Sequence, residues 1–257
     1  MKREQKASGS PRTLFKWLSV LLAIAVWQVA AMLLSEELIL VSPARVLLRL
    51  LTIWQEEGFF GTVLLSFSRI LLGFLLAVLL GSVLAFLAGR FSPVEILLHP
   101  YVAVIKTVPV ASFIVLAYVW LSSDYISSFI TFLIVFPTVY TGLLSGIHAQ
   151  DKKMEEMADV FDVSPFRRLI SVRLPQLEPY ILSAASLSAG LAWKSGVAAE
   201  IIAVPGSSIG EMIYYANLWM RSVDLYAWTV VLVLLSVLFE RAFVGLLKLA
   251  FRGIERI

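Results

Sequence analysis

Residues 151–175, DKKMEEMADVFDVSPFRRLISVRLP, form a polar interruption in an otherwise apolar chain and determine how the rest of the sequence is interpreted. Of the 257 residues, 60% are hydrophobic and 15% are charged, whereas soluble domains are nearer half apolar and a quarter charged. The flanking apolar runs are long enough to cross a membrane, and they are continuous rather than alternating, which favours helices over a barrel. We therefore predict an all-α polytopic membrane protein with about six transmembrane helices.

The chain divides into a short tail and one membrane domain. We expect a cytoplasmic tail over residues 1–13 and a single transmembrane domain over residues 14–257. Pro100 and Pro109 are expected to interrupt the third span, because proline removes a helical hydrogen bond. The predicted spans are residues 14–34, 60–88, 96–120, 126–147, 177–204 and 225–249.

One connection between the predicted spans is expected to contain a helix, and another is expected to be a loop. Ser42 and Pro43 resemble the start of a helix, with serine as the cap and proline at the first position, so we predict a short amphipathic helix at the membrane surface. Residues 205–224 are small and polar, and we expect a loop there.

The distribution of lysine and arginine predicts the orientation. With the N-terminus inside, the inner segments contain 14 of these residues and the outer segments contain three. Positive charge accumulates on the cytoplasmic side of membrane proteins. We therefore expect both termini and residues 151–175 to be cytoplasmic.

The polar segment itself predicts two short helices with a tight turn between them. Residues 155–161 suit the first helix, and residues 165–173 suit the second, which begins with the sequence Ser-Pro. Asp162 falls at the turn. Pro175 is expected to end the second helix and to leave Leu174 extended.

This spacing resembles the cytoplasmic signature loop of ABC-importer permeases: Glu-Ala-Ala, three residues, Gly, nine residues, Ile, one residue, Leu-Pro. The chain reads Glu156-Met157-Ala158, three residues, Asp162, nine residues, Val172, Arg173, Leu174-Pro175. It departs from the pattern at Met157, which replaces alanine, and at Asp162, which replaces glycine. If that position requires a left-handed backbone, aspartate is one of the few other residues that tolerate it.

The resemblance extends from about Leu40 to Val233 and is closest to permeases of nitrate, sulfonate and taurine importers. The fragments that carry it are Ser42-Pro43, SFSRILLG (66–73), Lys106-Thr107-Val108-Pro109, Phe136-Pro137, Glu178-Pro179-Tyr180, Ala192-Trp193 and Ala198-Ala199-Glu200. The resemblance implies a type I importer permease in the bacterial inner (plasma) membrane. The solutes of this branch include nitrate, sulfonates, taurine and thiamine-precursor pyrimidines.

The resemblance also implies three partners besides the lipid bilayer: a cytoplasmic ABC ATPase dimer, an extracytoplasmic solute-binding protein and a second permease copy. ATP and magnesium would bind to the ATPase, and this chain would need no cofactor of its own. No nucleic acid is expected as a partner. The residues implied to dock on the ATPase are Glu155, Glu156, Ala158, Phe161, Asp162, Val163, Phe166, Leu174 and Pro175.

Ionisable residues inside the spans suggest where a solute passes. Such residues usually face a bundle interior or an aqueous cavity. Lys106 and Lys194 either lie beside a path for an anion or pair with a carboxylate on another helix; Arg69 is expected to be structural. Lys194 and Glu200 are six residues apart and therefore point to different sides of their helix. The candidate pathway residues are Lys106, Thr107, Pro109, Ser112, Trp193, Lys194 and Glu200.

The sequence offers little support for an enzyme. It has no phosphate loop of the form GxxxxGK[ST] and no HExxH pattern. Cysteine is absent, and His99 and His148 are far apart, so no metal site is expected. Two alternatives to an ATP-driven permease remain open at this stage: an ion-coupled secondary transporter or channel without an ATPase, and a membrane scaffold that does not transport.

Overall fold

The structure is a computed structural model that describes residues 11–34, 36 and 38–254; the predicted tail lies mostly outside the described residues. All regular elements in the described part are helices, which confirms the all-α class. In chain order they are α1 (Pro11–Leu34), α2 (Pro43–Ile53), α3 (Phe59–Arg90), α4 (Ser92–Thr107), α5 (Val110–Trp120), α6 (Ser123–His148), α7 (Lys152–Val160), α8 (Pro165–Arg168), η1 (Leu169–Arg173), α9 (Leu174–Ala203), α10 (Ile209–Leu218) and α11 (Ser222–Ile254).

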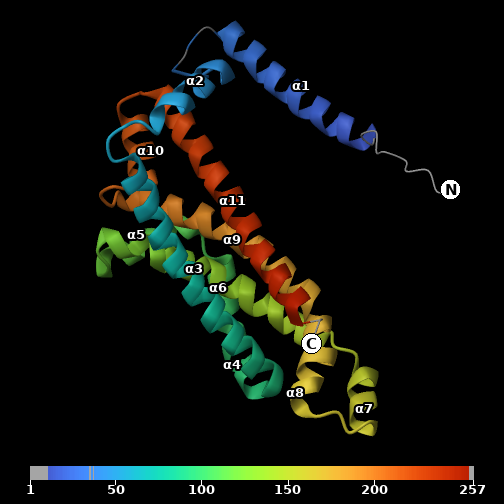
Figure 1. Cartoon of the computed structure of the whole chain (residues 1–257). Helices are drawn as coiled ribbons and strands as arrows, with labels where there is room; N and C mark the ends of the chain where they lie inside the picture. Colours follow the sequence, from blue (N-terminus) through green and yellow to red (C-terminus); the bar gives the residue numbers. More distant parts are fainter. Residues whose placement is uncertain (1–10, 35, 37, 255–257) are drawn as a thin grey trace, which may run out of the picture.

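Three helices, α3, α6 and α11, are long and apolar enough to cross a membrane, and α4 with α5 forms a fourth, bent candidate. The predicted fifth span, α9, has 30 residues, but Lys194, Glu200 and several serines make it less apolar. The apolar stretch Leu18–Leu34 of α1 is shorter than the three long spans. In Figure 1, α1 diverges from the bundle that the other long helices form.

Small residues bring the central helices close together. A Cβ added to Gly73 of α3 would lie 2.1 Å from the backbone oxygen of Ser128 on α6, so only glycine fits there. A Cβ added to Gly142 of α6 would lie 2.7 Å from the Cβ of Ala184 on α9. Small residues in membrane helices permit such close packing. The small residues of α9 therefore pack one of its faces tightly against α6.

The third predicted span breaks at one proline and not at the other. α4 and α5 meet at an angle of 104°, with Pro109 as the N-cap of α5 and Val108 extended (φ −75°, ψ 133°). The residue before a proline is pushed towards this extended shape. Pro100 lies inside α4 without ending it, so the expectation that it interrupts the span was wrong.

The predicted loop over residues 205–224 contains the helix α10, which corrects that expectation. The hydroxyl of Ser208 accepts a hydrogen bond from the backbone N–H of Glu211, and the Glu211 carboxylate accepts one from the N–H of Ser208. This reciprocal capping box satisfies donors that a helix start leaves free. Serine followed three residues later by glutamate was therefore a local signal for a helix.

The chain also remains helical where we expected Leu174 to be extended, and that expectation was wrong. Leu174 has φ −63° and ψ −43°, and its N–H donates to the carbonyl of Leu169, five residues back. Residues 169–173 form one wide π-helical turn, η1, that leads directly into α9. Pro175 lies in the first turn of α9, where the missing N–H of proline costs little.

The predicted surface helix is α2. Ser42 is its N-cap, although the serine hydroxyl makes no capping bond. Val46 and Ile53 are buried, whereas Leu47 and Leu51 are exposed, so α2 packs one edge on the bundle and leaves another apolar edge open.

Candidate functional site

Residues 151–175, which we call the coupling segment, project from one end of the helix bundle. In Figure 1, α7 and α8 lie at this end, and α2 and α10 lie at the opposite end. The start of the segment is fixed to the start of α9, because the N–H of Asp151 donates to Oε1 of Gln176 over 2.7 Å. The Asp151 carboxylate caps α7 by accepting from the N–H of Lys153 over 2.9 Å.

A tight turn reverses the chain after α7. The N–H of Val163 donates to the carbonyl of Ala158 over 2.9 Å, and the N–H of Asp162 donates to the carbonyl of Asp159 over 3.1 Å. This pair of bonds is the Schellman arrangement, which places the residue at Asp162 in the left-handed region. Asp162 has φ 49°, so the backbone shape that glycine would favour is present in this chain.

Ion pairs hold the two arms of the segment together. The guanidinium of Arg173 binds both carboxylate oxygens of Glu155, from Nε to Oε1 over 2.8 Å and from Nη2 to Oε2 over 2.9 Å. Arg168 pairs with Asp159 and lies 3.8 Å from Oε2 of Glu155. The bidentate hydrogen bonds from Arg173 hold the pKa of the Glu155 carboxyl below its ordinary value. Arg173 is therefore the main partner of Glu155, although 18 residues separate the two in the sequence.

Apolar side chains project outward around the turn. The exposed fractions are 82% for Val160, 73% for Phe161 and 70% for Phe166. Large apolar side chains gathered on an exposed surface mark a contact with another protein or with a membrane, and here they project from the polar segment rather than from a predicted span. The outer surface of the turn is therefore suited to insertion into a groove on another protein.

The predicted docking residues fall into two groups in the structure. Glu155 and Ala158 face inward, since Glu155 is ion-paired and Ala158 is 1% exposed. The exposed members are Glu156, Phe161, Asp162, Phe166 and Pro175, and the half-buried members are Val163 and Leu174.

The predicted pathway residues are distributed over three places. Lys106, Thr107, Pro109 and Ser112 are exposed at or near the bend between α4 and α5. The ammonium of Lys106 donates to the hydroxyl of Thr141 on α6 over 3.1 Å.

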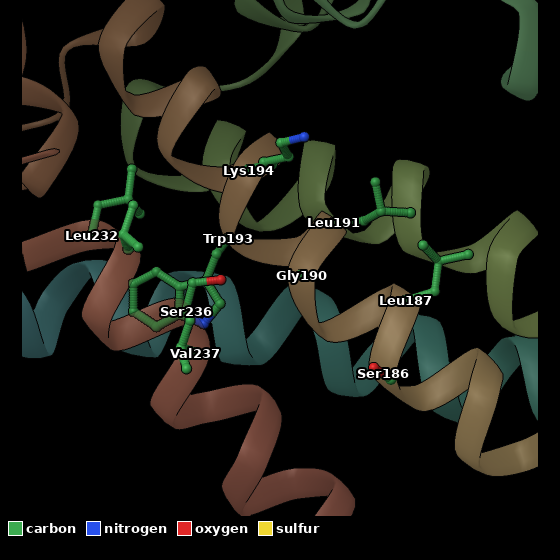
Figure 2. A pocket seen from close by; sticks show the side chains of 10 residues that line it. Ser186, Leu187, Gly190, Leu191, Trp193, Lys194, Leu232, Ser236 and Val237 are labelled. Atoms are coloured by element: carbon green, nitrogen blue, oxygen red, sulfur yellow. The ribbon is translucent and has the colours of Figure 1, made fainter. Parts of the chain in front are cut away.

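Trp193 and Lys194 occupy neighbouring positions on α9 but face different ways. A hollow of about 490 Å³ lies against α9 and α11 and is bordered by both residues. Figure 2 shows the Trp193 ring turned towards Ser236 and Val237 of α11, and Lys194 pointing away from them. Trp193 is 1% exposed, whereas Lys194 is exposed.

Glu200 lies inside the protein, on a different side of α9 from Lys194, as the spacing predicted. Its Oε2 accepts from the hydroxyl of Ser66 over 2.8 Å and from the N–H of Gly210 over 3.1 Å. Trp193 and Glu200 are both buried, so neither lies on the exposed surface that holds Lys106. Their assignment to a solute pathway stays a prediction.

Arg69 is structural, as expected. Its guanidinium donates to Asp124 of α6 over 2.6 Å, so this carboxylate is engaged by Arg69 and not by a lysine. The pairing of Lys106 or Lys194 with a carboxylate of another helix, which the sequence left open, is not found among the described residues.

The chain was compared with known proteins. Residues 70–252 match the family described as the inner membrane component of binding-protein-dependent transport systems. SsuC of Bacillus subtilis, a permease assigned to aliphatic sulfonate transport, is 30% identical over 95% of this chain and 89% of its own length.

Two further relatives are named for the transport of taurine and of nitrate. The taurine transport system permease protein TauC of Escherichia coli is 30% identical, over 93% of this chain and 86% of its own length. The nitrate import permease protein NrtB of Synechococcus elongatus is 26% identical, over 75% of this chain and 72% of its own length.

Proposed function

Because this chain belongs to the family of inner-membrane components of binding-protein-dependent transport systems, we propose that it forms the solute path of an importer that is driven by a separate ATPase. It is a multi-pass membrane permease of an ABC transporter, and its relatives are transport proteins rather than enzymes. ATP and magnesium would then bind to the partner, and this chain would contribute no catalytic group.

The observation that carries the proposal is the shape of the coupling segment. Its turn has the left-handed backbone at Asp162, its outer surface presents Phe161 and Phe166, and ion pairs fix its two arms. A preorganised apolar projection binds with a smaller loss of conformational entropy than a flexible loop does. We therefore place the ATPase contact at Glu156, Phe161, Asp162 and Phe166.

The same geometry suggests how ATPase closure would reach the membrane. From Pro165 the chain is helical through α8 and η1 and into α9 without an extended break. The bond from Asp151 to Gln176 and the pair between Glu155 and Arg173 tie the other arm to this helix. A displacement of the turn would therefore move the start of α9 with it, since rigid secondary elements carry coupling between sites.

For the solute, we propose a small anion of the kind its relatives import. Aliphatic sulfonates and nitrate, the solutes in the names of two relatives, are anions, whereas taurine, named for a third, also carries an ammonium group and is a net-neutral zwitterion. Lys106 and Lys194 place positive charge on exposed surfaces of α4 and α9. These cations would favour an anion over a cation or a neutral solute.

The subunit composition that we propose is the one implied by the family. Two copies of the permease would enclose the path, two ATPase chains would bind the two coupling segments, and an extracytoplasmic solute-binding protein would deliver the solute. In this arrangement both termini and the coupling segment are cytoplasmic, in agreement with the excess of lysine and arginine on that side.

Co-purification with the ATPase tests the proposal. The double variant Glu156→Lys, Phe161→Gln is expected to lose the ATPase and solute-dependent ATP turnover. The matched control is Glu57→Lys, Phe60→Gln, which makes the same changes at exposed positions just before α3 and in its first turn. If the first variant retains the ATPase and its solute-dependent turnover, the coupling segment is not the docking site.

A further inference from the structure

A polar hollow of about 400 Å³ lies between α4, α6 and α9 and shares only Leu187 with the lining of the hollow shown in Figure 2. It is bordered by one lysine and a set of hydroxyl groups: Lys106, Thr138, Thr141, Ser145, Tyr180 and Ser183. Four of these residues are exposed: Lys106, Ser145, Tyr180 and Ser183. A surface with this many polar groups on membrane helices is poorly suited to lipid and is typical of a cavity or a solute path.

Hydrogen bonds orient Lys106 within this hollow. Its ammonium donates to the hydroxyl oxygen of Thr141 over 3.1 Å, and that hydroxyl donates to the carbonyl of Pro137 over 2.8 Å. The Thr141 hydrogen is thus engaged with the backbone, and the threonine acts as an acceptor for the lysine. An ammonium has three donors, so two remain for a ligand.

The hollow has positive charge and no balancing carboxylate. None of the described residues that border it is Asp or Glu. Of the carboxylates on these three helices, Asp124 is paired with Arg69, Glu200 accepts from Ser66 and Gly210, and Glu95 lies 3.5 Å from His148. Glu178 of α9 borders a different hollow, together with Leu174 and Phe251. A cation inside a membrane protein is costly unless an opposite charge accompanies it. An anion from solution would supply that charge.

The position of the hollow relates it to the coupling segment. Ser145 lies three residues before His148, where α6 ends, and Ser183 lies nine residues after Leu174, where α9 begins. At 1.5 Å per residue these positions are about 5 Å and 14 Å from the helix ends. The hollow therefore lies in the half of the bundle that carries α7 and α8, on the helix that η1 joins to the coupling segment.

We propose that this hollow is a binding site for the transported anion, in which Lys106 pairs with a small monoanion and the hydroxyls of Thr138, Tyr180 and Ser183 donate to its oxygens. The ligand class is a compact oxyanion without an amino group, such as an alkanesulfonate or nitrate. An ammonium on the ligand would find no carboxylate among the residues that border the site. The inference rests on the proposed import of an anion and adds a specific place where the permease itself holds it.

Direct binding tests this site. The permease with its ATPase, in lipid nanodiscs and without a solute-binding protein, is titrated with radiolabelled ethanesulfonate and, separately, with taurine, which differs by one amino group. Ethanesulfonate is expected to bind at least about tenfold more tightly than taurine, a difference of about 1.4 kcal/mol. Lys106→Met is expected to weaken ethanesulfonate binding at least about tenfold, Lys106→Arg to retain most of it, and Ser183→Ala to weaken it by a smaller factor.

The control is Lys248→Met, which removes an exposed lysine from α11 and is expected to leave binding unchanged. Equal binding by Lys106→Met and the unmodified protein, or tighter binding of taurine than of ethanesulfonate, overturns the site. Repeating the titration on the permease alone separates the two proposals. Lysine-dependent anion binding by a chain that never co-purifies with an ATPase would refute the proposed function and leave the site standing.

Discussion

The hydroxyl of Ser66 on α3 donates to Oε2 of Glu200 on α9 over 2.8 Å, and both residues are fully buried. The same hydroxyl accepts from the N–H of Ile209, and the same carboxylate oxygen accepts from the N–H of Gly210. Two side chains from two long helices therefore satisfy the first free donors of α10. This contact fixes the short helix to the bundle at the end opposite to the coupling segment.

Ser66→Ala is expected to lower the free energy of unfolding by about 1–3 kcal/mol, because it leaves the Ile209 N–H and one bond of Glu200 unsatisfied in the interior. Thermal unfolding of the purified permease in detergent measures the change. The control is Ser68→Ala on the same helix, whose exposed hydroxyl bonds only to the carbonyl of Leu65. Equal losses for the two variants would contradict the role of the buried contact.

The Ser66–Glu200 contact also shows what the sequence could and could not predict. Its partners are 134 residues apart, and nothing in the apolar pattern of either helix indicates that they meet. The turn at Asp162 was predictable because its geometry depends on a few consecutive residues. The continuity of η1 with α9 was not predictable, because a proline usually ends a helix. Here the widened turn before Pro175 lets the helix continue.

The hollow at Lys106 was predictable only in part. The lysine was conspicuous in the sequence because it interrupts an apolar run. Its hydroxyl neighbours come from helices that meet it only in the folded chain, so their closeness to the lysine could not be predicted from the sequence. The docking residues could be proposed from the sequence because the spacing of the coupling segment is contiguous and local; their contact with an ATPase stays a prediction.

Gly73→Ala is expected to destabilise the protein by about 1–3 kcal/mol or more, because the added methyl group would lie 2.1 Å from the backbone oxygen of Ser128 and would force α3 and α6 apart. The thermal midpoint in detergent measures the loss. Gly61→Ala is the matched control on α3, since nothing lies within 4 Å of its added methyl group. It is expected to be neutral or to stabilise the helix by up to about 1 kcal/mol. Comparable destabilisation by both variants would contradict the close approach of α3 and α6.

The pair between Glu155 and Arg173 predicts an acid-sensitive coupling segment. The hydrogen bonds from Arg173 lower the pKa of Glu155 from its ordinary value of 4.5. A carboxyl whose pKa is lower in the folded state stabilises that state above its unfolded pKa, and the stabilisation is lost as the pH falls through the folded pKa. The contribution is therefore complete above about pH 4.5 to 5 and declines below that range.

Glu155→Gln measures this contribution. The difference in stability between the unmodified protein and the variant, followed by hydrogen exchange of the amides of 151–175, is expected to be constant from pH 7 to pH 5 and to shrink at lower pH. Glu156→Gln is the control, because Glu156 is exposed and forms no ion pair with the described residues, and it is expected to give no such trend. A difference that persists unchanged at pH 3 would show that the pair does not hold the two arms together.

Asp162 tests whether the turn requires a backbone shape or a particular side chain. With φ 49°, the position lies in the left-handed region, where glycine is unstrained and a β-branched residue costs of order 1–3 kcal/mol. Asp162→Gly is therefore expected to retain ATPase co-purification and solute-dependent ATP turnover, whereas Asp162→Val is expected to weaken both. Lys152→Val, at an exposed helical position of α7, controls for the β-branched side chain itself. Loss of transport in a folded Asp162→Gly protein would instead mean that the aspartate side chain contacts the ATPase directly.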